Sequence, residues 1–354
     1  MQNHKFKIYI FLTFLLFFTT ACSVSFKSGE TGNDGGVYAS ANQGKLWKQM
    51  ALIPTVTGSA KSIASLDNYS LAMDPSDDEA IYFGSLDNGL FYSYDRAKEW
   101  RVAEGLERKT VTAVAVDPDA KCIIYAAMEN KIYKSTDCNR AWEQAYFDNN
   151  VETKIYSIAI DYYDSRNVYI ATSRGEVIKS PDRGTSWQTV GRFDDEVKKI
   201  VISPNDSRVL FVGTDKKSVW RSLDGGVNWV SLEENLKTFK DSKKFRDLAM
   251  SQAEPGVIFL ATDYGLLKSS DQGNTWSQIE LITPEKKAVI NSIAVSPKNA
   301  KEIYYVTNTT FYSSENGGET WTSDKLPTGR AGWRLLLDPE NTNIIYLGAR
   351  RIQN

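Results

Sequence analysis

Short runs of alternating hydrophobic and polar residues, without lasting helical periodicity, make up the chain from Val37 to its end. One kind of run closes on Asp-Pro or Ser-Pro, as at residues 71–75 and 293–297, and a second apolar run follows it, as at residues 168–171. Alternation with a period of two between turn-forming residues predicts β-strands. The pattern therefore predicts an all-β protein.

A further short strand in each unit leads into a turn with the pattern Ser-x-Asp-x-Gly-x-x-Trp. Seven copies end on tryptophans that lie 42 to 53 residues apart, at Trp47, Trp100, Trp142, Trp187, Trp229, Trp276 and Trp321. The third position holds Asp95, Asp137, Asp182, Asp224 and Asp271, with Asn42 and Asn316 in the outermost copies. A fixed period of this size indicates a propeller or solenoid, and four strands per unit favour a propeller blade.

The two halves of the repeat are offset along the chain. The first half-unit, residues 37–50, supplies the third and fourth strands of a blade, and the last, residues 333–349, supplies the first and second. A closed ring in which the two ends complete one blade removes the exposed sheet edges. We therefore expect one domain, residues 36–354, folded as a seven-bladed β-propeller of four-stranded antiparallel blades.

The repeated turn resembles the Asp-box, or BNR, repeat of sialidases, sortilin-type receptors, xyloglucan-degrading glycosidases and photosystem II assembly factors. The resemblance covers residues 37–349. It implies that the box carboxylates are structural, accepting hydrogen bonds from their own turns, and that the boxes lie on the face away from any ligand. The tryptophan is expected to fill the gap between neighbouring blades.

The first 21 residues have the composition of a targeting segment, with Lys5 and Lys7 before an apolar run too short to span a bilayer. The following Thr-Thr-Ala-Cys resembles a bacterial lipoprotein signal, although Thr19 stands where an aliphatic residue is usual. That resemblance implies export, acylation of Cys22, palmitate included, and a membrane anchor in the cell envelope. An ordinary cleaved signal peptide is the alternative. Residues 22–35 are expected to form a flexible tether.

Removing residues 1–21 leaves 40 basic and 44 acidic residues, so the mature chain carries no electrostatic footprint for nucleic acid. It also removes His4, the only histidine. Histidine-dependent nucleophilic catalysis and histidine-containing zinc sites are thereby excluded. We expect no metal and no cofactor.

Two cysteines remain after Cys22. Cys122 and Cys138 are spaced symmetrically about a polar turn at Asn130, which places them opposite each other for a cross-strand disulfide. An oxidising compartment would form it. Two separate small core residues are the alternative.

A ligand is expected on the face opposite the boxes, at the mouth formed by the start of each inner strand. Aligning the inner strands gives the charged and aromatic candidates Tyr69, Tyr156, Lys198, Lys199, Arg246, Asp247, Trp333 and Arg334, with Lys216 from a neighbouring turn and Arg350 and Arg351 from the last strand. Arginines beside aromatic rings are typical of protein interfaces and of sugar or carboxylate recognition. Solvated loops rich in Lys and Arg are the alternative.

Two functions remain open. The first is a monomeric, membrane-anchored binding or scaffold module, without enzymatic activity, for a protein or glycan partner. The second is a glycoside hydrolase, sialidase-like or xyloglucanase-like, or a glycan-binding subunit. The resemblance to sialidases implies an Arg-Ile-Pro element that the sequence lacks, and only Asp247 is acidic at the inner-strand entry. The long segment 49–68 includes an apolar stretch that could cover the mouth, dock a partner or pack as an ordinary connection.

Overall fold

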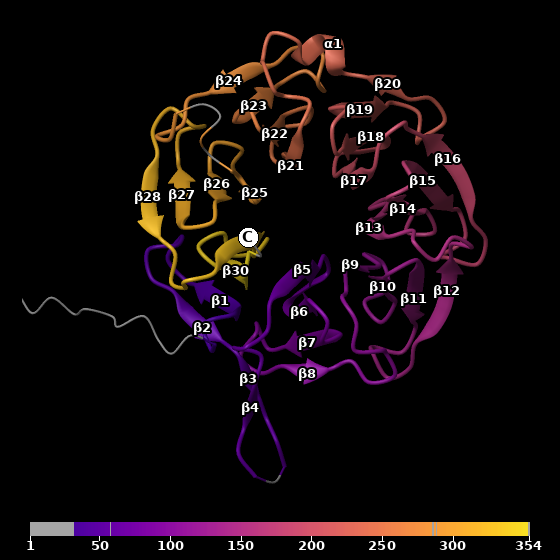
Figure 1. The fold of residues 1–354 in the computed structure, drawn as a ribbon, viewed down its shortest axis with the longest axis vertical. Helices are drawn as coiled ribbons and strands as arrows, with labels where there is room; N and C mark the ends of the chain where they lie inside the picture. Colours follow the sequence, from indigo (N-terminus) through magenta and orange to yellow (C-terminus); the bar gives the residue numbers. More distant parts are fainter. Residues whose placement is uncertain (1–31, 57, 285–286, 288, 353–354) are drawn as a thin grey trace, which may run out of the picture.

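Seven four-stranded antiparallel sheets surround a central axis in a computed structural model of the chain (Figure 1). The structure describes residues 32–56, 58–284, 287 and 289–352. The predicted seven-bladed β-propeller is confirmed. The targeting segment, Cys22 and most of the tether lie outside the described residues.

Each blade runs from an inner strand at the axis to an outer strand at the rim, and Figure 1 labels them in chain order. Blade 1 consists of β5 (Asn68–Asp74), β6 (Asp77–Ser85), β7 (Leu90–Tyr94) and β8 (Arg101–Val102). Blade 2 consists of β9 (Ala113–Val116), β10 (Ile124–Met128), β11 (Lys131–Ser135) and β12 (Glu143–Phe147). Blade 3 consists of β13 (Ile155–Ile160), β14 (Val168–Thr172), β15 (Glu176–Ser180) and β16 (Gln188–Arg192).

Blade 4 consists of β17 (Val197–Ser203), β18 (Asp206–Thr214), β19 (Val219–Ser222) and β20 (Val230–Ser231), followed by the short helix α1 (Glu233–Leu236). Blade 5 consists of β21 (Phe245–Met250), β22 (Ile258–Thr262), β23 (Leu266–Ser269) and β24 (Ser277–Ile279). Blade 6 consists of β25 (Ser292–Val295), β26 (Ile303–Val306), β27 (Thr310–Ser314) and β28 (Thr322–Lys325).

Blade 7 closes the ring with both ends of the chain, as predicted. Its strand order is β2 (Lys48–Met50), β1 (Gly36–Ser40), β30 (Ile345–Arg350) and β29 (Ala331–Leu337). β1 pairs with β30 from Gly36↔Ala349 to Ser40↔Ile345. Every blade thus has neighbours on both sides, which leaves no open sheet face at the seam.

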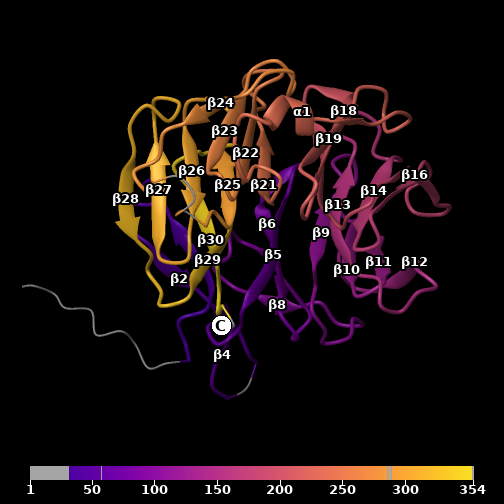
Figure 2. The ribbon, with the colours of Figure 1, turned by 45° about the horizontal axis from the view of Figure 1, so that its top comes forward.

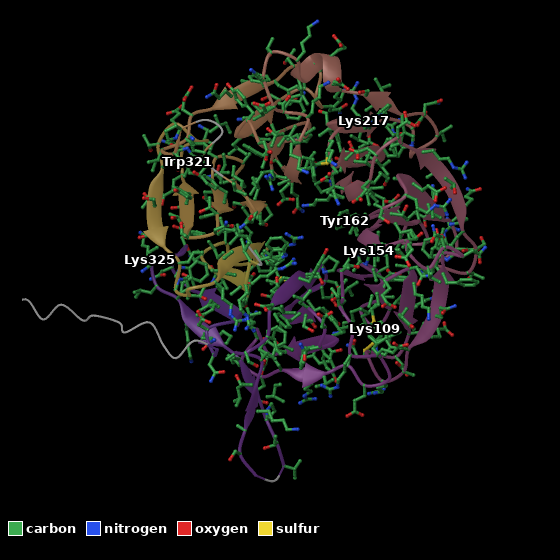
Figure 3. All side chains as sticks on the ribbon, in the orientation of Figure 1. Lys109, Lys154, Tyr162, Lys217, Trp321 and Lys325 are labelled. Carbon is green, nitrogen blue, oxygen red and sulfur yellow. A yellow bond between two sulfur atoms is a disulfide. The ribbon has the colours of Figure 1, made fainter. Side chains whose placement is uncertain are left out.

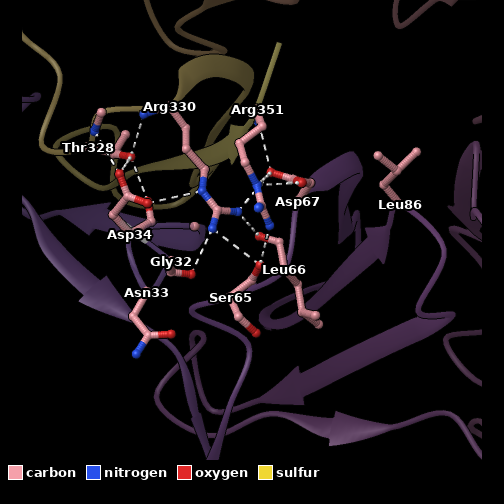
Figure 4. Close-up of polar contacts among 12 residues, drawn as sticks. Gly32, Asn33, Asp34, Ser65, Leu66, Asp67, Leu86, Thr328, Arg330 and Arg351 are labelled. Carbon is pink, nitrogen blue, oxygen red and sulfur yellow. Dashed lines mark hydrogen bonds and ion pairs between the residues drawn. The ribbon is translucent and has the colours of Figure 1, made fainter. Parts of the chain in front are cut away.

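A buried arginine reinforces this closure (Figure 4). Arg330, whose side chain is 3% exposed, forms ion pairs with Asp34 at 3.1 Å and Asp67 at 2.8 Å. Its guanidinium also donates to the carbonyl oxygens of Gly32, Ser65 and Leu66. One side chain therefore ties the beginning of the described chain to blade 7 and to the entry of blade 1.

The hydrophobic core is divided among the gaps between blades. The inter-blade cluster around Phe83 and Trp100, for example, holds Val37 and Tyr346 from blade 7 beside Phe91 from blade 1. The box tryptophans contribute as expected. Figure 3 labels Trp321, whose indole N–H donates to the Glu280 carbonyl of the preceding blade at 2.8 Å. Trp100, Trp187 and Trp229 make the same bond to the preceding blade.

The segment between blades 7 and 1 forms a hairpin, β3 (Leu52–Ile53) with β4 (Lys61–Ser62). It extends away from the ring in both views (Figure 1, Figure 2), so it does not cover the axial opening. Its base is packed: Ile63 is fully buried, and the Leu52 carbonyl accepts the Trp100 N–H at 2.8 Å. The segment serves at this base as a packed connection.

Cys122 and Cys138 form a disulfide in this structure. The bond joins the residue two positions before β10 to the box turn that follows β11, and the Cys138 N–H also donates to the Cys122 carbonyl at 3.2 Å. Within the described ranges, no helix is long and apolar enough to cross a bilayer.

Candidate functional site

The seven Asp-boxes form a structural network on one face of the ring. In the third blade the Ser180 hydroxyl donates to Asp182 at 2.8 Å and accepts the Gly184 N–H at 2.7 Å, while Asp182 accepts the Ser186 N–H at 2.7 Å. The same contacts recur at Asp95, Asp137, Asp224 and Asp271 and at the two Asn copies. Each carboxylate is occupied by its own turn, which supports the structural role.

The electrostatics of the boxes agree with that role. Hydrogen bonds from the Ser186 hydroxyl and N–H lower the pKa of Asp182 to about 2, and hydrogen bonds from Asn228 lower that of Asp224 to about 2. A carboxylate stabilised in its charged form is the opposite of what a general acid needs. No group of three or more His, Cys, Asp or Glu side chains in the described part of the chain is arranged to hold a metal ion.

The opposite face, which we call the mouth, carries a repeated backbone irregularity. The register between inner and second strand shifts at the entry of five blades, between Asn68/Ser70, Ile155/Ser157, Val197/Lys199, Phe245/Asp247 and Gly332/Arg334. The skipped residues are five of the predicted candidates, Tyr69, Tyr156, Lys198, Arg246 and Trp333. A bulge leaves its extra residue outside the ladder and redirects its side chain, and bulges are frequent beside binding sites.

Side chains at the entry of the inner strands join each blade to the next around the axis. Lys199 Nζ lies 2.6 Å from Asp247 Oδ1, and Asp247 Oδ2 accepts the Ile293 N–H at 2.8 Å. Comparable bonds link the other neighbouring blades, made by Ser70, Thr112, Ser157, Ser292 and Trp333. Lys199 and Asp247 therefore pair with each other and link blades 4, 5 and 6, which gives both side chains a structural role.

Three further predicted cations are paired locally. Lys198 forms an ion pair with Glu196 and lies 4.4 Å from the centre of the Tyr156 ring, whose hydroxyl donates to Glu196 at 3.2 Å. Arg246 pairs with Asp263 at 2.5 Å. Lys216 lies 3.6 Å from Asp215, which also accepts from Lys244.

The mouth of blade 7 differs, because it holds arginines without a carboxylate partner. Arg350 Cζ lies 4.1 Å from the centre of the Trp333 ring and 4.8 Å from that of Tyr69. Arg334 Cζ lies 5.1 Å from the same Trp333 ring, and its guanidinium donates to the Trp333 carbonyl at 3.0 Å. Within the described ranges, neither arginine is within ion-pair distance of an acid, and burial lowers the pKa of both.

Two hollows adjoin the mouth. The bore of the ring is a cavity of about 290 Å³ lined mainly by apolar residues of β5, β9, β13 and β17. It reaches from Ser157 and Lys199 at the mouth to Tyr162 at the box-face end of blade 3, which lies near the axis in Figure 3. A wider hollow of about 800 Å³ lies beside α1, lined by Lys216, Phe239, Lys243, Arg246, Asp263 and their neighbours. The sequence located the mouth residues, but not Glu196, whose partners Tyr156 and Lys198 lie on β13 and β17, the inner strands of two neighbouring blades.

Comparison with known proteins finds similarity to families of repeat-containing β-propellers. The family model Sortilin-Vps10, described as "Sortilin, neurotensin receptor 3", matches residues 130–263. A xyloglucanase of Hypocrea jecorina (strain QM6a) is 29% identical over 117 residues, which is 27% of this chain and 14% of the relative. The predicted resemblance to Asp-box repeat proteins is confirmed.

Solved structures share the fold at low sequence identity. The GH74 xyloglucanase from Xanthomonas campestris superposes with a TM-score of 0.64 at 16% identity, over 80% of this chain and 51% of that one. A structure of YCF48 bound to D1 peptide gives 0.63 at 14% identity, over 84% and 95%. The extracellular domain of BT4673 from B. thetaiotaomicron gives 0.62 at 13%, over 85% and 39%. The chain thus spans 14% of the curated relative and about half of the xyloglucanase structure.

Proposed function

We propose that this protein is an exported, lipid-anchored binding module that holds a protein or glycan partner on its mouth face without transforming it. The observation that supports this proposal most directly is the set of five mouth bulges, whose extra residues Tyr69, Tyr156, Lys198, Arg246 and Trp333 lie outside the strand ladders. Aromatic and arginine side chains of this kind supply most of the free energy in protein interfaces. The neighbour YCF48, which the superposition covers over 95% of its chain and which was solved bound to D1 peptide, supports a binding role by analogy of fold.

The state of the mouth carboxylates favours binding over hydrolysis. A glycoside hydrolase needs two carboxyl groups across the scissile bond, one of them an acid with a raised pKa. Asp247 is held by Lys199 and by backbone N–H groups, Asp263 by Arg246, and Glu196 by Lys198. Although burial opposes it, the Lys244 hydrogen bond holds the pKa of Asp215 below its usual value.

Chemical cross-linking in the native membrane tests the binding role. The variant Tyr156→Ala/Lys198→Ala/Arg246→Ala removes three bulged side chains, whereas Arg166→Ala/Arg208→Ala removes two exposed arginines beside the first-to-second-strand connections of the opposite face. We expect the mouth variant to lose a cross-linked partner that the control retains. Identical partners for both variants contradict a mouth-face partner.

Hydrolase activity is the alternative function, and the xyloglucanase neighbours make its substrate easy to choose. Release of reducing ends from xyloglucan is measured with the wild type and with Asp247→Asn. Turnover that the variant abolishes would replace the binding proposal with the enzymatic one.

The anchor has its own test. Wild-type protein is expected to enter the detergent phase on phase separation of membrane extracts, and Cys22→Ala the aqueous phase. Equal partition of the two shows that Cys22 carries no lipid.

A further inference from the structure

Four arginines gather where blade 7 meets the mouth, and they fall into two pairs. Arg330 and Arg351 both bind Asp67, at 2.8 and 3.1 Å. Arg334 and Arg350 have no such acid among the described residues, although both are half-buried. Asp247 acts on Arg334 and Asp67 acts on Arg350 only from beyond ion-pair distance. Two guanidinium groups without a contacting acid in a partly desolvated place lower the stability of the empty protein.

The surroundings hold these two arginines in place instead of neutralising them. The Arg350 guanidinium is in contact with both the Trp333 and the Tyr69 rings, and the Trp333 indole N–H is fixed by the Tyr69 carbonyl at 3.1 Å. The Arg334 guanidinium donates hydrogen bonds to the carbonyl oxygens of Trp333 and Asn291, at 3.0 and 3.5 Å. Since a guanidinium has five N–H donors, most donors of both groups remain available for a ligand.

The charges also act on each other. Arg350 contributes to the lowered pKa of Arg334, after the larger effect of burial. Both Cζ atoms lie within 5.1 Å of the centre of the one Trp333 ring, so both guanidinium groups lie beside the same indole. Two positive charges match a doubly charged oxyanion better than a single carboxylate.

We propose that Arg334 and Arg350, supported by Trp333 and Tyr69, form a phosphate-binding subsite at the mouth of blade 7. The phosphate group belongs either to a soluble phosphate ester or to a phospholipid headgroup. The planar guanidinium geometry suits two-point contact with phosphate oxygens. The subsite requires neither the lipid anchor nor the partner of the proposed function, so the failure of either proposal leaves the other standing.

Titration calorimetry of the full-length protein in detergent at low salt, with inorganic phosphate as the probe, tests the subsite. Loss of a charge-assisted hydrogen bond predicts that Arg334→Gln and Arg350→Gln each weaken phosphate binding roughly tenfold or more. Arg166→Gln on the opposite face serves as the control and is expected to bind like the wild type. Thermal unfolding of each variant establishes that the fold is intact.

The pH dependence separates phosphate from carboxylate recognition. The second ionisation of a phosphate monoester has a pKa of about 6, so binding of glycerol phosphate is expected to strengthen between about pH 5 and pH 7.5. Acetate carries one charge throughout this range and is expected to bind more weakly without that rise. Equal affinity for acetate and phosphate at pH 7.5 contradicts the proposal.

Two further binding measurements distinguish a soluble phosphate ester from a phospholipid headgroup as the ligand. Glycerol phosphate binding without binding to phosphatidic acid vesicles indicates a soluble ester, whereas arginine-dependent binding to these vesicles, absent with phosphatidylcholine, indicates a lipid headgroup. If wild type shows no phosphate binding, or if both Gln variants bind phosphate as the wild type does, the subsite does not exist.

Discussion

Replacing Arg330 by Ala should test how the ring is closed. The Arg330 side chain is 3% exposed and forms two ion pairs and three bonds to carbonyl oxygens. Breaking a buried pair from one side costs about 3–5 kcal/mol. Asp34 is 31% exposed and Asp67 keeps Arg351, so we expect the lower end of that range, about 3 kcal/mol.

The measurement is thermal and urea unfolding followed by tryptophan fluorescence. For a domain of this size, about 3 kcal/mol corresponds to a fall in Tm of roughly 4–5 °C. Arg351→Ala is the matched control, because Arg351 pairs with the same Asp67 but is 60% exposed, so its loss should cost under about 1 kcal/mol. Equal destabilisation by the two substitutions refutes the reasoning that burial makes Arg330 the closing contact.

Three more predictions concern the boxes and the core. Because the folded-state pKa values of Asp182 and Asp224 are about 2, below the unfolded value of about 3.9, their stabilisation is complete above roughly pH 4 and is lost as the pH falls towards 2. Asp182→Asn/Asp224→Asn, which copies the Asn of two native boxes, should flatten acid unfolding in that window; an unchanged curve contradicts this. The double variant Cys122→Ser/Cys138→Ser removes the disulfide, whose cysteines are 16 residues apart in the sequence. Its free energy of unfolding, measured in urea, should be about 3 kcal/mol lower than that of the wild type. Wild-type protein with a reduced disulfide should show the same loss. Trp100→Ala should cost about 3–5 kcal/mol, because Trp100 is fully buried, and more than the same change at half-buried Trp47; the reverse order contradicts the packing argument.

The fold was predictable because the structural contacts are local and repeated. Each Ser-Asp-Gly-Trp turn closes through bonds that span two to four residues, so the seven copies reveal the same geometry. The half-unit offset then leaves few ways to complete the last blade. The box face could therefore be predicted in detail from the pattern alone.

The mouth was predictable in position but not in pairing. Alignment of the inner strands located Lys199 and Asp247, yet their mutual ion pair joins residues 48 positions apart on neighbouring blades. The bulges at Tyr69 and Trp333 have no sequence signal of their own. Arg330 was not singled out, because its partners Asp34 and Asp67 lie 296 and 263 residues away along the chain.

The pairing of β1 with β30 also sets the order in which the molecule can fold. β1 is among the first parts of the propeller to be synthesised, but its partner from Ile345 to Ala349 comes last. At 5–20 residues per second, the roughly 300 intervening residues take about 15–60 s to appear. During that time one edge of the β1–β2 hairpin has no strand to pair with, so a nascent chain stalled before residue 345 should be the form most prone to aggregate.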